Sequence, residues 1–158
     1  MRHVLPMTAL CIAYAVMAQV PTAAVPTGQP GLAQYAPSKV KVTGTPCELE
    51  SRRVWLRKSG RWGTVGGKPK TTCTALVEKI HQESLLQHQV AGIWFAVGRV
   101  FQVDAVGIRQ LEQKNLEFAC RGTSWTKWRT LTMGTVRLRG IEYGAIVASP
   151  GFDLPCGA

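Results

Sequence analysis

The sequence predicts a mostly β, disulfide-stapled domain, built as a small antiparallel sandwich or half-barrel. The stretch GTVRLRGIEYGAIVAS (134–149) alternates apolar and polar residues with the period of two that a strand requires. Other short apolar runs are separated by Gly- and Pro-containing turns, and four cysteines are spread over the chain after residue 46. The alternative class is α+β with one short helix near residues 75–88.

Residues 1–18 have the pattern of a secretory signal peptide. A short basic start precedes an apolar stretch from Val4 to Ala18, and small residues precede a cleavage position after Ala18. The apolar stretch is shorter than the about 20 residues that a membrane-spanning helix needs. We therefore expect a secreted, extracellular protein whose mature chain has no transmembrane segment.

Two further regions follow the signal peptide. Residues 19–46 are rich in Pro, Ala, Gly and Thr and have little apolar periodicity, so we expect a flexible leader. Residues 47–158 are numerous enough to form a single domain around one core.

Four cysteines remain after removal of the signal peptide, which carries Cys11: Cys47, Cys73, Cys120 and Cys156. In an oxidising compartment they predict two disulfides, for which three pairings exist. We favour 47–73 with 120–156, because these close the shortest loops, each worth about 3.5 kcal/mol. Zinc sites use closely paired ligands such as C-x2-C, so we expect neither a metal nor another cofactor.

The first elements of the domain are short. A strand is predicted around Val54 to Leu56, a turn at Ser59-Gly60, and a return strand from Trp62 to Val65. The run Gly66-Gly67-Lys68-Pro69 is predicted to be a loop. It lacks the spacing and the hydroxyl residue of a phosphate-binding loop.

The middle of the chain is less clear. TALVEKIHQESLLQHQ (74–89) fits either a short helix or imperfect strands. The apolar run from Val90 to Val103 predicts a buried strand kinked at Gly98. Residues 104–114 are predicted as a connection with room for one helical turn, and residues 115–121 as a short strand that carries Cys120.

The clearest element is the stretch 134–149. Val136, Ile141 and Tyr143 lie on one face of the predicted pairing, whereas Arg137 and Glu142 lie on the other. The pattern predicts an amphipathic β-hairpin with a tight turn near Arg139-Gly140.

Several stretches together resemble a group of small secreted actinobacterial proteins that have four mature cysteines and no assigned activity. They are KPKTTC, IHQESLL, the Trp94 run, EQKN, CRGTSWTKW, GTVRLRGIEYGAIV and the closing LPCG, and they cover most of the chain after Cys47. The resemblance implies location and shape but no catalytic residues. It also favours strand over helix for ALVEKIHQES.

The charge distribution points to a binding role. The formal net charge is +10, and nine Lys or Arg lie between Lys39 and Lys70 against two Glu. From Arg121 to Arg139 there are five basic residues and no acid. A basic exported protein is attracted to anionic polymers, although high charge can also serve only solubility.

Two tryptophans in CRGTSWTKWRT (120–130) sharpen that prediction. In a strand, Trp125 and Trp128 point to opposite faces, so at most one of them faces the core. Trp125 shares its face with Lys127 and Arg129. The predicted binding residues, with the hairpin cations that continue this face, are Trp125, Lys127, Arg129, Arg137 and Arg139. In the alternative, Trp125 only covers an open edge and the cations are solvated.

The same reasoning gives three function classes. The favoured one is a secreted, non-catalytic protein that binds an anionic extracellular or envelope partner, with nucleic acid a less favoured ligand. The second is a small secreted hydrolase or toxin that uses His81 with Glu83 or Asp104. The third is a protein–protein interaction module. A second basic cluster surrounds Trp55 and Trp62.

Overall fold

The computed structural model describes residues 38–158, which contain ten β-strands and no helix. The strands are β1 (Lys39–Val42), β2 (Cys47–Glu50), β3 (Trp55–Arg57), β4 (Thr64–Gly67), β5 (Lys70–Val90), β6 (Ile93–Glu112), β7 (Leu116–Ala119), β8 (Trp125–Leu138), β9 (Ile141–Ala148) and β10 (Phe152–Pro155). The predicted mostly β class is confirmed. The helix near residues 75–88 is wrong, because that segment lies inside β5. The predicted signal peptide and residues 19–37 of the leader lie outside the described residues.

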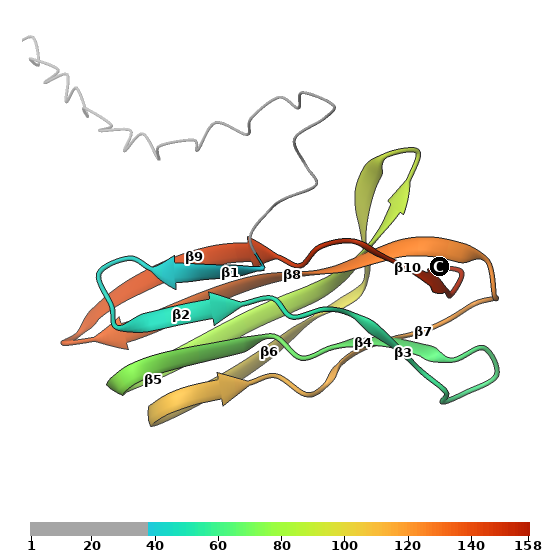
Figure 1. The fold of residues 1–158 in the computed structure, drawn as a ribbon. Helices are drawn as coiled ribbons and strands as arrows, with labels where there is room; N and C mark the ends of the chain where they lie inside the picture. Colours follow the sequence, from blue (N-terminus) through green and yellow to red (C-terminus); the bar gives the residue numbers. More distant parts are fainter. Residues whose placement is uncertain (1–37) are drawn as a thin grey trace, which may run out of the picture.

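The strands form two antiparallel sheets (Figure 1). The larger sheet has seven strands in the order β1-β2-β5-β8-β10, with β6 paired to β5 and β9 paired to β8. It curls into a half-barrel in which β1 lies beside β9. The smaller sheet has the order β3-β4-β7 and continues the structure at the end where β8 begins.

The interior holds two apolar clusters separated by buried polar side chains. One cluster gathers around Leu49 and Ile80, and the other around Leu86 and Trp128. The polar side chains between them form a belt: Ser51, Thr71, Gln82, Ser84, Gln113, Thr130, Thr132 and Ser149. Hydrogen bonds link part of this belt, as most buried polar groups require. Thr132 Oγ1, for example, lies 3.1 Å from Ser84 Oγ and 3.2 Å from Ser51 Oγ. The Thr130 hydroxyl and the side-chain amide of Gln113 have no hydrogen-bond partner in residues 38–158.

The two disulfides have the favoured pairing. Cys47 and Cys73 are directly opposite each other on β2 and β5. Cys120 follows β7 and is joined to Cys156, which follows β10. The second disulfide therefore ties the small sheet to the large one.

The domain begins before Cys47. Residues 39–42, which the composition placed in the flexible leader, form β1 and pair with β2 in full register. Val42 is completely buried in the core around Leu49. The Val-Lys-Val alternation in this short segment gives it an apolar face to bury, despite the polar composition around it.

The return strand predicted at 62–65 and the loop predicted at 66–69 lie about two residues too early in the sequence. The strand β4 runs over Thr64–Gly67, so Gly66 and Gly67 are strand residues and not loop residues. Glycine is required there by packing, because a Cβ on Gly67 would lie 2.7 Å from Thr130 Oγ1. Only Lys68 and Pro69 connect β4 to β5.

The apolar run from Val90 to Val103 is not a buried strand. The turn Ala91-Gly92, with positive φ at both residues, reverses the chain, and β5 and β6 form one long hairpin. Of the run only Phe101 is buried. The predicted kink at Gly98 is confirmed as an irregularity in the pairing, with φ of 72°. Residues 104–112 continue β6 and contain no helical turn.

Candidate basic-aromatic site

The β8 strand places its two tryptophans on opposite faces, as the period of two predicts. Trp128 is completely buried, and its Nε1–H donates a hydrogen bond of 3.0 Å to the carbonyl of Cys156. Trp125 is 72 % exposed on the outer face of the sheet. The outer face of β8 therefore carries Trp125, Lys127 and Arg129 side by side, in alternation with buried residues.

A third tryptophan joins this surface from the β5–β6 hairpin. The guanidinium carbon of Arg129 lies 4.2 Å from the centroid of the Trp94 ring, and Arg129 Nε donates to Gln87 Oε1 at 2.7 Å. Partial burial lowers the pKa of Arg129 below its ordinary value, because desolvation penalises the charged form. Cation–π contact and the hydrogen bond thus fix the direction in which this cation points.

Gly151 allows the close approach of Trp94 to β8. A Cβ at Gly151 would lie 2.9 Å from both Trp94 Cη2 and Lys127 Cδ. The indole ring therefore lies across the outer face, between Arg129 and the β9–β10 connection. We call Trp94, Trp125, Lys127 and Arg129 the basic-aromatic surface.

The two cations of this surface have no ion-pair partner in residues 38–158. Asp153 is opposite Lys127 in the β8–β10 pairing, but their charged atoms are not within ion-pair distance. Five cations elsewhere in residues 38–158 are paired with carboxylates: Lys39, Arg52, Arg57, Lys79 and Arg137. Lys127 and Arg129 are therefore available to an external anion.

Arg137 and Arg139 lie at the other end of β8. Arg137 shares the outer face with Arg129, but eight residues of strand separate them by roughly 26 Å. Arg139 occupies the tight turn with Gly140, both with positive φ, which confirms the predicted hairpin. The five predicted binding residues thus form two groups, too far apart for one small ligand.

The second basic cluster also places cations on tryptophan rings. Arg61 lies 4.5 Å from the Trp62 centroid and Arg57 lies 5.3 Å from that of Trp55. Arg57 is also within 3.5 Å of Glu117. This cluster is on β3 and its turn, in the small sheet.

Comparison of the chain with models of protein families, with curated proteins and with solved structures finds no match. The resemblance to secreted actinobacterial proteins stays a prediction.

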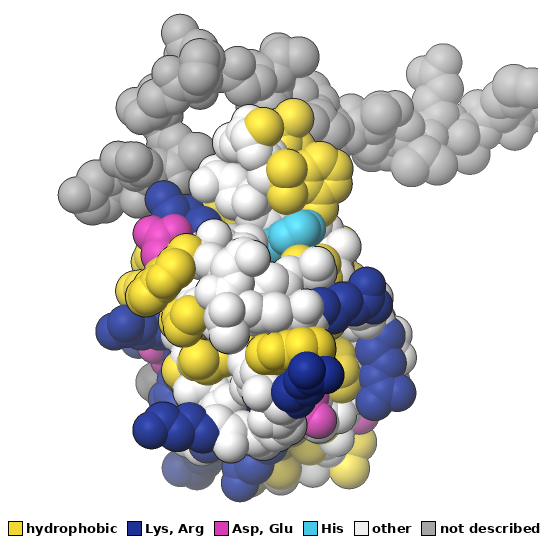
Figure 2. All heavy atoms as spheres, turned by 90° about the vertical axis from the view of Figure 1, so that its right-hand side faces the viewer, with side chains coloured by type: hydrophobic (Ala, Val, Ile, Leu, Met, Phe, Trp, Pro, Cys, Tyr) yellow, Lys and Arg dark blue, Asp and Glu magenta, His cyan; other side chains and the backbone are white. Residues whose placement is uncertain are grey.

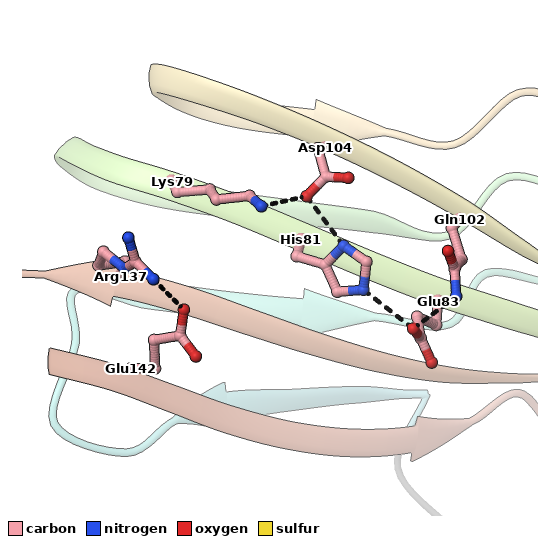
Figure 3. A network of polar contacts seen from close by, with 7 residues as sticks. All are labelled: Lys79, His81, Glu83, Gln102, Asp104, Arg137 and Glu142. Carbon is pink, nitrogen blue, oxygen red and sulfur yellow. Dashed lines mark hydrogen bonds and ion pairs between the residues drawn. The ribbon is translucent and has the colours of Figure 1, made fainter.

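His81 forms the second polar site on the outer face (Figure 3). Its Nδ1 lies 2.9 Å from Asp104 Oδ1 and its Nε2 lies 3.1 Å from Glu83 Oε1. Burial opposes the charge on the ring, but the hydrogen bonds to both carboxylates outweigh it and raise the pKa of His81. Hydrogen bonds from Lys79 and His81 lower the pKa of Asp104.

The surroundings of His81 are open and charged. A shallow hollow of about 320 Å³ is lined by Lys79, His81, Glu83, Met133, Thr135, Arg137 and Glu142. A carboxylate at each ring nitrogen favours the protonated His81 ring, which donates to both. In that form the ring has no free nitrogen to accept a proton, which a general base requires.

The side chains of Ser84 and His88 do not join His81. Ser84 is buried on the opposite face, where it donates to Thr132. His88 also has the inward parity, and its ring is 5.8 Å from that of Trp128. Within residues 38–158, no group of three or more His, Cys, Asp or Glu side chains converges as a metal site would require.

Sequence reasoning missed Trp94 as a member of the basic-aromatic surface and Gln87 as the hydrogen-bond partner of Arg129. Both are separated from β8 by more than thirty residues, and only the strand pairing brings them together. One signal was present: Gly92 lies between two β-rich runs, and glycine readily adopts the positive φ that a two-residue hairpin turn needs.

Proposed function

We propose that this protein is an exported binding protein that recognises an anionic extracellular or envelope partner through the basic-aromatic surface. One observation carries the proposal: Lys127 and Arg129 lie beside Trp94 and Trp125 without an ion-pair partner in residues 38–158. Unpaired cations bind anionic groups, and neighbouring indole rings stack on sugars or bases.

Export is supported by two features. The chain begins with the pattern of a signal peptide, and it contains two disulfides, which persist in oxidising compartments. In residues 38–158 no helix has the length and apolarity to cross a membrane. The net charge of +10 would steer the protein toward anionic surfaces.

A secreted hydrolase or toxin that uses His81 is the second candidate. The convergence of Asp104 and Glu83 on the ring favours a special role for His81. Both ring nitrogens are engaged, however, which favours a structural ion network over proton transfer. If the His81→Ala variant keeps its fold but loses a hydrolytic activity, the result favours this second candidate over the binding function.

Binding at rising salt concentration tests the main proposal. The mature protein is titrated with polyphosphate, a sulfated polysaccharide and duplex DNA as anionic probes. We expect the logarithm of the affinity for at least one probe to fall linearly with the logarithm of the salt concentration. The double variant Lys127→Gln with Arg129→Gln should weaken that binding roughly tenfold at low salt, because each cation contributes about 1 kcal/mol or less to the binding free energy.

A charge-matched variant is the control. Arg109 and Lys114 are exposed and make no ion pair in residues 38–158, so Arg109→Gln with Lys114→Gln removes the same charge elsewhere. If both double variants lose the same affinity, the loss comes from the change in net charge and not from the basic-aromatic surface. Binding that is independent of salt would refute the electrostatic mechanism.

A further inference from the structure

The tip of the β5–β6 hairpin carries exposed apolar side chains. The hairpin rises out of the large sheet (Figure 1), and Figure 2 shows hydrophobic side chains gathered on this upper part of the molecule. Val90 is 49 %, Ile93 61 % and Phe95 46 % exposed, and Ala91 in the turn is exposed as well. We call Val90, Ala91, Ile93 and Phe95 the apolar tip.

The apolar tip continues the inward face of the sheet beyond the end of the core. Along β5, Leu86 is buried in the core and Val90 has the same parity. Val90 pairs with Ile93, and His88 pairs with Phe95, so these side chains share one face. Pairing between β5 and β8 stops at His88, and no described residue covers the face beyond it.

The hairpin itself carries charge of one sign near the apolar tip, whereas β10 places Asp153 opposite Lys127. The twenty residues from Ser84 to Val103 contain no Asp or Glu, and Arg99 is their only formally charged residue. Arg129 stands next to the hairpin on its outer side, where its guanidinium contacts the Trp94 ring, and Lys127 and Trp94 both approach Gly151. An apolar projection with cations behind it is complementary to an anionic lipid surface.

The spacing along the hairpin suits an interfacial position. Gln87 is hydrogen-bonded to Arg129. Val90 lies three positions further along β5, a distance of about 10 Å along the strand. Apolar faces of interfacial segments enter about 5–10 Å into the headgroup and acyl boundary. Entry to this depth brings Arg129 to the headgroups, with Trp94 at the boundary that tryptophan prefers.

The apolar tip is too small for a stable protein interface. Stable complexes bury about 800 Å² on each partner, and three half-exposed side chains and an alanine provide well under that area. A bilayer needs no matching surface, because lipid chains adapt to whatever apolar group enters.

We propose that the apolar tip enters the outer leaflet of an anionic lipid bilayer while Lys127 and Arg129 contact its headgroups. This inference rests on the proposed function and identifies the anionic partner as a lipid surface. The hairpin is the insertion element, and the Trp94–Arg129 contact sets the direction in which it projects.

Vesicle co-flotation of the full mature protein tests the inference. Vesicles of phosphatidylcholine, with and without phosphatidylglycerol, are compared with soluble polyphosphate. We expect binding to the vesicles that contain phosphatidylglycerol, and a loss of about tenfold in Ile93→Ser with Phe95→Ser, since each change removes apolar burial in the bilayer. The same variant should bind polyphosphate as the wild type does. The matched control is Val106→Ser with Ile146→Ser, whose side chains are 72 % and 65 % exposed elsewhere on the sheet.

The outcomes separate the two proposals. Vesicle binding that is unchanged in Ile93→Ser with Phe95→Ser overturns the insertion of the tip. If the wild-type protein binds polyphosphate but not the vesicles, the lipid inference is overturned and the proposed function stands. If it binds neither, both proposals are overturned. A wild-type dimer that this variant converts to a monomer, measured by light scattering, assigns the tip to a second copy of the chain and also overturns the inference.

Discussion

Replacing Trp128 with phenylalanine tests the assignment of this tryptophan to the core. The indole Nε1–H donates to the Cys156 carbonyl, and phenylalanine leaves that buried acceptor without this partner, at a cost of about 1–3 kcal/mol. The smaller ring leaves a gap worth about 1 kcal/mol more. The expected loss is therefore roughly 2–4 kcal/mol of the free energy of unfolding, against a total of about 5–15 kcal/mol for a domain.

Urea denaturation with intact disulfides, followed by circular dichroism, measures this loss. The slope against urea should be unchanged, so that the shift in midpoint reports stability alone. Trp125→Phe is the matched control, and because Trp125 is 72 % exposed its cost should stay within about 0.5 kcal/mol. A cost for Trp128→Phe as small as that of Trp125→Phe would refute the burial argument.

Two further predictions concern other parts of the sheet. Because the carboxylates of Glu83 and Asp104 outweigh burial and raise the pKa of His81 above 6.5, its contribution to stability is complete below pH 6.5. The contribution is lost as pH rises through the folded-state pKa, and the midpoint of urea unfolding, measured from pH 5 to pH 9, should lose this dependence in His81→Gln. Gly134→Val should cost about 1–3 kcal/mol by the same assay, because a Cβ there lies 3.0 Å from Leu49 in a filled core; a neutral effect would show that the core has room.

The parts of the fold that the sequence predicts are those set by local periodicity. The period of two separates Trp125 from Trp128, and Arg139-Gly140 supplies the positive φ values of a two-residue turn. The first two inferences need only neighbouring residues. The disulfide pairing agrees with the preference for short loops, with sequence separations of 26 and 36, although Cys120 and Cys156 follow strands of different sheets.

What the sequence does not predict depends on where strands end relative to one another. The run from Val90 to Val103 is apolar, and apolar strands are usually buried. The β5–β6 hairpin, however, separates from β8 after His88, so the first half of the run is left uncovered. The contact between Trp94 and Arg129 has the same origin, since it requires the register of three strands. Gly151 carries no sequence signal of the close packing that it permits.

The polar belt between the two apolar clusters has a consequence for strand alignment. A slip of β8 by one residue would turn its apolar side chains outward, but a slip by two keeps them inside, so apolar patterning alone permits it. The side chains at positions 132 and 134 oppose it. A slip in one direction puts Gly134 in the place of Thr132, which leaves the buried Ser84 hydroxyl without its partner, at a cost of about 1–3 kcal/mol. A slip in the other direction puts Thr132 in the place of Gly134, where a Cβ lies 3.0 Å from Leu49. Thr132 and Gly134 in the middle of the sheet thus favour one alignment of its strands among those that would bury the same apolar residues.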